Sequence, residues 1–298
     1  MAGFTVTGLS DYTAKATELL TAGVLYSEDM ERYSWMQGVQ YKQFLNYLEA
    51  TPVVQAGACG LGATGSTVFT QEEMVVATYA IRDQYCKNDL VKKALSIPGG
   101  TLDGDFGPII EGVLTTELIN KTKQIVDKDL WLGSTGLIDG WVANLGTASI
   151  SLNTYAGVTV SQTNVDDVID DFIDNITDVM WSKGELTLHC SVAIFNMYKR
   201  NRLNSNFYRD ANSNFGPFEM YLYGYEGQIT IKAEPGLVSE NTMVLTWDKN
   251  FYIGTDEVTE MAEAKWYYNE DTDYYKYKSS FKLGTQVAFK NQVITNLA

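Results

Sequence analysis

Two stretches near the end of the chain decide the fold. The first is Asn250-Phe-Tyr-Ile-Gly-Thr-Asp256, which follows the apolar residues 243–247, and the second is Phe281-Lys-Leu-Gly-Thr-Gln-Val-Ala-Phe289, which follows a Tyr-rich segment. Alternating apolar and polar residues are typical of β-strands. We therefore expect the chain from residue 220 onward to be mainly β, with strands at residues 228–232, 243–247 and 285–293.

Two helices are predicted upstream by apolar residues that recur every three or four positions. The first covers about 108–129, with Pro108 tolerated in its first turn. The second covers about 164–181, where Thr163 or Asn164 can cap the N-terminus. The apolar stripes are Ile109, Val113, Leu114, Leu118, Thr122, Ile125 and Val126 in the first helix, and Val165, Val168, Ile169, Phe172, Ile173, Ile176, Val179 and Met180 in the second.

The first third of the chain changes its pattern. The spacing of apolar residues at 41–48 is compatible with a short helix, but residues 67–81 are rich in Val, Thr, Phe and Tyr, which favours a strand. The Gly-rich residues 56–65 lie between them. The simplest interpretation is two long strands joined by a flexible tip. A short helix at 89–95 is expected to end at the Pro and Gly residues 97–100.

In their order along the chain, these segments resemble the major capsid proteins of tailed phages. In that family a strand ends in an Asn-x-x-x-Gly-Thr-Asp turn, and a closing strand carries a Gly followed by alternating apolar residues, as in the two stretches quoted above. The first half is similar to the extended-loop region of capsid proteins from phages of gut Bacteroidetes, crAss-like or related. The segments that carry this part of the resemblance are residues 40–48, 53–60, 66–71 and 85–90.

The resemblance implies an α+β subunit of the Hong Kong 97-type capsid fold. Such a subunit consists of an N-terminal arm, an extended β-hairpin loop, a peripheral domain with a long spine helix, and an axial domain. Placed on this sequence, these parts would be the arm at 1–30, the extended loop at 31–82, the peripheral domain at 83–137 and again at 226–298, its spine helix at about 108–129, and the axial domain at 138–225.

The resemblance also implies a function and partners. Copies of the chain would self-assemble into hexamers and pentamers of an icosahedral head that encloses double-stranded DNA, without sequence-specific contact to the packaged genome. We expect assembly in the cytoplasm of the bacterial host, a final location in the virion, and no enzymatic activity or cofactor. Further partners would be a separate scaffolding protein, a portal, and decoration or head-fibre proteins.

Composition agrees with a structural role inside a cell. The 298 residues are 45% apolar, enough for one large core or two modest ones, and Asp plus Glu number 37 against 22 Lys plus Arg. A formal net charge of -15 should repel nucleic-acid phosphates, which argues against tight DNA binding. Cys59, Cys86 and Cys190 are widely spaced and predict reduced thiols. No apolar run is long enough to span a bilayer.

Residues of three kinds are candidate contacts between copies. The tip glycines also spell a dinucleotide-binding pattern, but a β-branched run follows them where a helix would have to begin. An acidic row on the second predicted helix could hold Ca²⁺ or Mg²⁺, form a solvated face, or meet the basic residues of a neighbouring copy. Tyrosines near residue 270 could stack on bases or sugars, although acidic neighbours argue against nucleic acid. The candidates are Gly57, Gly60, Gly62, Gly65, Asp166, Asp170, Asp174, Lys199, Arg200, Arg202, Tyr267 and Tyr274.

His189 is the only histidine, and it lies in the apolar residues 186–190, which predict a buried strand. Ser191 follows and can cap a helix that continues to Arg200. Consecutive strand residues point to opposite faces, so a triad of His189 with Cys190 or Ser191 is disfavoured. We therefore expect a hydrogen-bonded core histidine.

Two alternatives to a capsid protein remain: a tail-tube or other phage structural protein, and a soluble enzyme based on carboxylates, Lys or Tyr.

Overall fold

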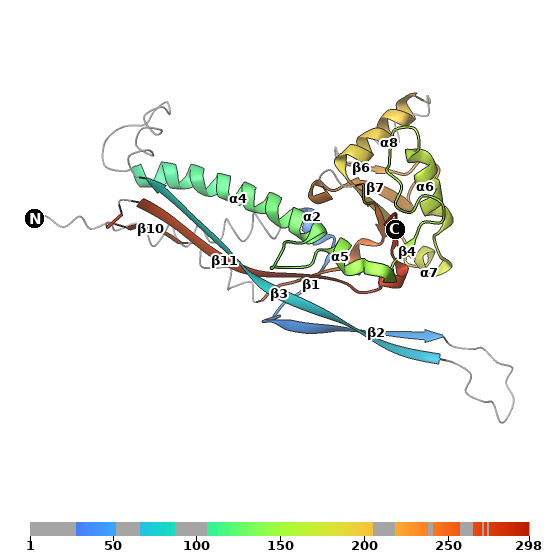
Figure 1. Ribbon diagram of the computed structural model, residues 1–298, viewed down its shortest axis with the longest axis horizontal. Helices are drawn as coiled ribbons and strands as arrows, with labels where there is room; N and C mark the ends of the chain where they lie inside the picture. The colour runs from blue at the N-terminus through green and yellow to red at the C-terminus, as the bar shows by residue number, and fades with distance from the viewer. Residues whose placement is uncertain are drawn as a thin grey trace, which may run out of the picture.

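The computed structural model describes residues 28–51, 66–86, 106–204, 218–237, 241–256, 265–269, 271–272 and 274–297. These residues form an elongated unit around one six-stranded sheet and a long helix, and a second unit around another six-stranded sheet (Figure 1). Three predicted features lie outside the described residues: the arm up to residue 27, the Gly-rich tip at 52–65, and the short helix at 89–95.

The first sheet has the order β1-β9-β11-β3-β2, and β10 pairs with another part of β11. β1 runs parallel to β9, and the other neighbours are antiparallel. Its strands are β1 (Ser34–Met36), β2 (Lys42–Thr51), β3 (Ser66–Cys86), β9 (Phe251–Gly254), β10 (Lys265–Asn269) and β11 (Tyr274–Val287).

β3 is long enough to belong to two pairings. Its C-terminal part pairs with β11, from Val76 to Cys86, and its N-terminal part pairs with β2, from Ser66 to Val75. As a result the β2–β3 hairpin projects beyond the body of the subunit (Figure 1). The prediction of two long strands is confirmed, and the helical alternative at 41–48 is wrong because its apolar residues lie in a strand.

The two quoted stretches pair with each other. Gly254 of β9 lies opposite Gly284 of β11, and a Cβ at Gly284 would stand 2.4 Å from the Val75 carbonyl oxygen. The buried Asn250 side chain donates to the Phe289 carbonyl oxygen at 3.1 Å and accepts from the Phe289 amide at 2.8 Å. Glycines permit the close approach of the strands, and the asparagine joins the two segments.

The strand predicted at 285–293 is wrong in its second half. β11 ends at Val287, a 3₁₀ turn η6 (Lys290–Gln292) follows, and β12 (Ile294–Thr295) begins in the other sheet. The chain therefore leaves one sheet and enters the other within this apolar stretch. Residues 287–289 are all apolar and residues 290–292 are all polar, so the alternation stops where the chain leaves the first sheet.

Helix α4 (Phe106–Leu132) lies along the first sheet, close to the predicted 108–129. Val126, Leu130 and Trp131 pack in one core with side chains of β3, β9 and β11. Ile125, predicted on the apolar stripe, is instead 55% exposed. Near the C-terminal end of α4, the Tyr79 hydroxyl donates to the buried Asp129 carboxylate at 3.0 Å.

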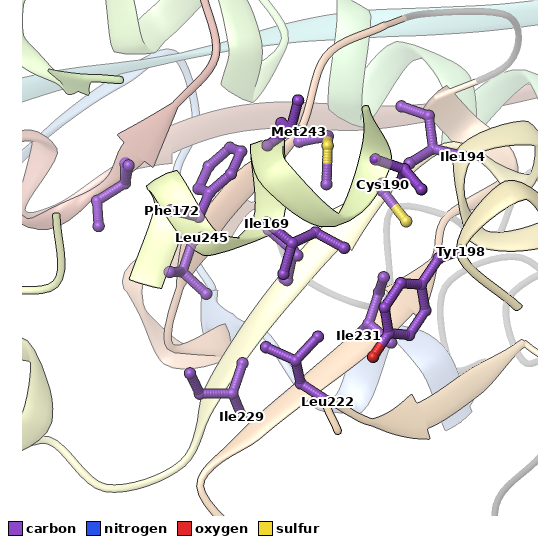
Figure 2. Close-up of a cluster of buried hydrophobic side chains, with 14 of the residues drawn as sticks. Ile169, Phe172, Cys190, Ile194, Tyr198, Leu222, Ile229, Ile231, Met243 and Leu245 are labelled. Atoms are coloured by element: carbon purple, nitrogen blue, oxygen red, sulfur yellow. The ribbon is translucent and has the colours of Figure 1, made fainter. Parts of the chain in front are cut away.

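The second unit has a sheet of order β4-β12-β8-β5-β7-β6, with β5 and β7 parallel. α6 and α8 cover its buried face, and Figure 2 shows the core between them and the sheet, including Phe172, Cys190 and Tyr198. The predicted buried strand at 186–190 is confirmed, as is the helix after Ser191, whose hydroxyl accepts from the Ile194 amide at 3.4 Å. The strands are β4 (Ile150–Ser151), β5 (Leu186–Cys190), β6 (Glu219–Tyr221), β7 (Ile229–Ala233), β8 (Val244–Thr246) and β12.

The helix predicted at 164–181 is two helices. α6 (Val165–Asp174) ends where Asn175 donates to the Asp171 carbonyl oxygen at 2.7 Å, and α7 (Asp178–Trp181) begins after Thr177, whose hydroxyl accepts from the Met180 amide at 3.4 Å. These side chains compete with the helical backbone bonds. The remaining elements are α2 (Glu28–Glu31), α5 (Trp141–Leu145), α8 (Val192–Asn204), η1 (Gly146–Ala148), η3 (Pro235–Leu237) and η4 (Asp248–Asn250).

Candidate assembly surfaces and a buried charged junction

The β2–β3 hairpin has two different faces. On one face, Leu45 and Met74 are buried, and the Tyr47 ring packs at a tilt against that of Phe289, with ring centroids 4.7 Å apart. On the other face large apolar side chains are uncovered, and Phe69 is 81% exposed. Tyr41, Phe44 and Val75 are further large exposed apolar residues of the hairpin and its base. An apolar face of this kind is typical of a surface that another chain covers.

The base of the hairpin is fixed to the body by charge and by backbone contacts. Lys290 Nζ lies 2.6 Å from Glu72 Oε2, and both side chains are mostly buried. Gln286 Nε2 donates to the Glu73 carbonyl oxygen at 2.6 Å. The exposed apolar face is therefore held at a defined position relative to the first sheet.

The predicted acidic row is only partly a free surface. Asp166 forms an ion pair with Arg202 at 3.1 Å and accepts from Asn201 at 2.7 Å, both within one chain. The sequence interpretation paired such residues between copies and did not foresee this contact. Asp170 and Asp174 are largely exposed. Partial burial of its carboxyl, and then the charges of neighbouring carboxylates, raise the pKa of Asp170, although the charge of Arg202 lowers it. Lys199 and Arg200 are exposed on α8.

One carboxylate of this helix has a structural role that sequence reasoning missed. Asp171 is buried, and its Oδ2 accepts from the backbone amides of Thr154 and Tyr155 at 2.9 and 3.0 Å. It therefore holds the loop that precedes α6. No group of three or more Asp, Glu, His or Cys side chains in the described part of the chain is arranged to hold a metal ion.

The tyrosine candidates belong to β10 and β11. Tyr267 is 39% exposed and lies opposite Lys276, while Tyr274 lies at the outer end of β11, opposite Asn269. The glycine candidates Gly57, Gly60, Gly62 and Gly65 lie outside the described residues, together with the dinucleotide-like string. The structure therefore places the acidic and basic candidates of α6 and α8 together and the tyrosines elsewhere, on the first sheet.

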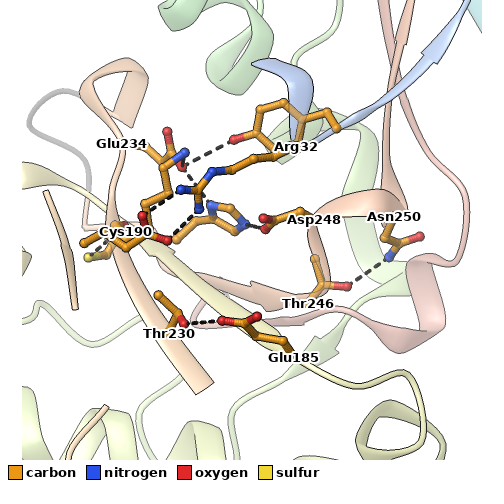
Figure 3. Close-up of polar contacts among 12 residues, drawn as sticks. Arg32, Glu185, Cys190, Thr230, Glu234, Thr246, Asp248 and Asn250 are labelled. Atoms are coloured by element: carbon orange, nitrogen blue, oxygen red, sulfur yellow. Dashed lines mark hydrogen bonds and ion pairs between the residues drawn. The ribbon is translucent and has the colours of Figure 1, made fainter. Parts of the chain in front are cut away.

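A charged cluster at the junction of the two units is centred on His189, and Figure 3 labels its two carboxylates, Glu234 and Asp248. The imidazole is fully buried; its Nδ1 lies 2.9 Å from Glu234 Oε1, and its Nε2 lies 3.2 Å from Asp248 Oδ1. Lys232 Nζ is 3.1 Å from the same Glu234 oxygen, and the Tyr33 hydroxyl donates to it at 3.3 Å. The expected hydrogen-bonded core histidine is thus confirmed.

The two carboxylates decide the charge of this histidine. Burial alone would lower the pKa of His189, but the hydrogen bonds and charges of Asp248 and Glu234 raise it above its ordinary value. Burial would raise the pKa of Glu234, yet His189 and Lys232 hold it below its ordinary value, and His189 does the same for Asp248. These directions all favour the state in which the imidazole is protonated and both carboxylates are ionised.

Sequence reasoning did not find the partners of His189. Glu234 and Asp248 lie in different connecting segments, and nothing in their local pattern marks them as buried. The same holds for Arg32, whose guanidinium forms a bidentate pair with Glu219 of β6 at 2.5 and 2.6 Å. Only pairing of the strands brings these residues together, and no spacing rule of the sequence encodes it.

The comparisons with known proteins identify the fold. No family model matches the chain, no curated protein matches it, and no helix in its described part could cross a membrane. The chain is similar to the capsid of a native GTA particle (9% identity, TM-score 0.58, 99% of this chain and 91% of that chain covered) and to the capsid of Myoviridae phage XM1 (11%, 0.54, 99% and 93%). It is also similar to a virus-like particle from Pyrococcus furiosus (8%, 0.53, 97% and 98%). The chain therefore has the mixed α/β fold of phage capsid proteins, as its sequence predicted.

Proposed function

We propose that this protein is the major capsid subunit of a tailed phage, and that its copies assemble into a closed icosahedral shell around double-stranded DNA. The observation that carries the proposal is the similarity of fold over 99% of the chain to two structures described as capsids. A similarity of this extent leaves almost no part of the chain for a different fold. The proposed role is structural, and it requires neither a cofactor nor a catalytic site.

The projecting hairpin supports self-assembly. Phe69 is 81% exposed and Phe44 49% exposed, and burying a side chain of this size stabilises an interface by about 1.5–3 kcal/mol. In a closed shell each copy would bury one such hairpin against a neighbour, so the contribution is repeated around the symmetry axes. Many modest interfaces then close one particle.

The finer parts of the proposal follow the Hong Kong 97-type pattern. Under it, the β2–β3 hairpin is the extended loop, α4 is the spine helix of the peripheral domain, and the unit around β5 and α6 is the axial domain that packs into hexamers and pentamers. Assembly in the bacterial cytoplasm would use a separate scaffolding protein, a portal, and decoration or head-fibre proteins. A phage of gut Bacteroidetes, crAss-like or related, is the proposed source because of the first-half sequence resemblance.

The test is expression of the chain alone, followed by mass photometry and negative-stain imaging. Closed shells, or discrete hexamers and pentamers, are the expected result. Long uniform tubes would favour a tail protein instead, and a monomer that persists when scaffold and portal candidates are supplied would overturn the proposal. Phe69→Ser should abolish large particles while leaving the fold intact, whereas Val179→Ser, at a 51% exposed position of α7, is the matched control and should assemble normally.

A further inference from the structure

His189 stands where the chain passes between the two units. It belongs to β5 of the second sheet, but its carboxylate partners lie in two connecting segments. Glu234 follows β7 and precedes η3, whose Gly236 lies directly against α4, where an added Cβ would stand 2.2 Å from the Asp127 carbonyl oxygen. Asp248 opens η4, which joins β8 of the second sheet to β9 of the first. One side chain therefore contacts both connections.

The surroundings of the imidazole belong mainly to the first unit. Its ring centroid lies 5.0 Å from that of Trp131 in α4, 5.4 Å from that of Phe251 in β9, and 6.3 Å from that of Tyr33. All three aromatic residues are in the first core. A residue of one sheet is therefore inserted into the aromatic core beneath the other, where water does not reach it.

The charges of the described residues around the imidazole balance only when it is protonated. Glu234 and Asp248 supply two negative charges, and Lys232 and the imidazolium supply two positive ones. The Tyr33 hydroxyl and the buried Cys190 thiol are neutral, because burial raises the pKa of Cys190. Arg32 is paired with Glu219. Loss of the proton leaves two buried carboxylates with one cation between them, an unfavourable arrangement.

We infer that protonated His189 is a positioning residue that clamps the two connecting segments, at 234–237 and 248–250, and so holds the two units of the subunit in one relative orientation. The clamp is a property of the single chain. It can therefore be tested without any shell, independently of the proposed function.

The pH dependence follows from the raised pKa of His189. A group whose pKa is higher in the folded protein stabilises fully below its ordinary value, here 6.5, and this contribution is lost as pH rises through the folded pKa. Between these two values one proton is released on opening, so opening of the junction should become about tenfold more frequent per pH unit. Glu234 and Asp248, with lowered pKa values, weaken the clamp only in acid, as pH falls through their folded pKa values.

Hydrogen exchange measured by mass spectrometry on the full-length chain tests the clamp between pH 5.5 and 9, after correction for the intrinsic pH dependence of exchange. In the wild type, peptides that cover residues 229–237 and 244–254 should show the tenfold rise per pH unit from about 6.5 up to the midpoint at which His189 titrates in the folded protein. His189→Gln should give a flat profile in that window. Glu219→Gln, which breaks the separate pair with Arg32, is the control and should keep the wild-type slope.

Because His189 is the only histidine, its imidazole resonances can be titrated directly by NMR on the unassembled chain. A midpoint above 6.5 is expected, and Asp248→Asn should lower it while leaving the protein folded. The inference is overturned by a midpoint at or below 6.5, by a wild-type exchange profile that is flat, or by a slope that persists in His189→Gln. If His189→Gln does not fold, an unchanged midpoint in Asp248→Asn overturns it equally. Exchange can be measured on monomers as well as on particles, so a result that overturns the clamp is distinct from a failure of the chain to assemble.

Discussion

Phe172→Ala should make the second unit open far more often while opening of the first unit changes little. The ring is fully buried on α6 in a core that is separate from the core beneath α4. Removing a buried phenyl ring costs about 3–5 kcal/mol, because transfer energy is lost and a cavity remains. At about 1.4 kcal/mol per factor of ten, the open form of the second unit should become roughly 150 to 4,000 times more populated. Units with separate cores can open separately.

Native-state proteolysis of the full-length chain, with cleavage sites assigned by mass spectrometry, measures this population when opening is fast relative to cleavage. Cuts within residues 150–204 and 218–233 should accelerate by the stated factor, and cuts in α4 should not. Val179→Ala, at an exposed position of neighbouring α7, is the control and should change stability by less than about 0.5 kcal/mol. Equal acceleration in both units, or an acceleration below tenfold, would refute the separation of the two cores.

Two further substitutions test the first unit. Gly284→Ala places a methyl group 2.4 Å from the Val75 carbonyl oxygen and should lower the free energy of unfolding, measured in urea, by about 1–3 kcal/mol. Ser280→Ala, elsewhere on β11, is the control and should lower it much less. Equal losses would contradict the close approach of β11 and β3. Tyr79→Phe removes the hydroxyl that donates to Asp129; burial raises the pKa of this carboxyl and the hydroxyl lowers it, so the pKa should rise further in the variant. The hydroxyl stabilises the ionised carboxylate, so the loss of about 1–3 kcal/mol at pH 7 should become smaller as pH falls through the pKa of Asp129, and a loss independent of pH would contradict the bond.

Regular periodicity allowed most elements to be predicted from the sequence. The helical period of 108–129, the alternation in β7 and β8, and the β-branched run of β3 each predict the type of element that forms, although Ile125 of the α4 stripe is exposed. Periodicity failed where it continued through a break. The apolar stripe of 164–181 passes through Asn175 and Thr177, whose side chains end one helix and begin the next.

The sequence predicted which types of residue form the candidate surfaces, but not which residues contact one another. An acidic helix and a tyrosine cluster are visible in the sequence, but the pair of Asp166 with Arg202 requires that α6 and α8 pack together. The partners of His189 were invisible for a similar reason, because a buried carboxylate in a connecting segment has no periodic signature. Long-range packing of helices in the first case and of strands and their connections in the second, which a single sequence does not reveal, decides these contacts.

The double pairing of β3 also sets the order in which the subunit can fold. The hydrogen bond between Gln286 and the Glu73 carbonyl oxygen joins residues 213 positions apart. A ribosome that adds about 5–20 residues per second needs more than ten seconds between synthesis of these two partners. During that time β3 has only β2 to pair with, while most strands of the second sheet emerge together. We therefore expect β5, β6, β7 and β8 of the second sheet to pair first, and β11 and β12, the last strands to be made, to complete the first and the second sheet. Until then the long β3 edge depends on cellular chaperones.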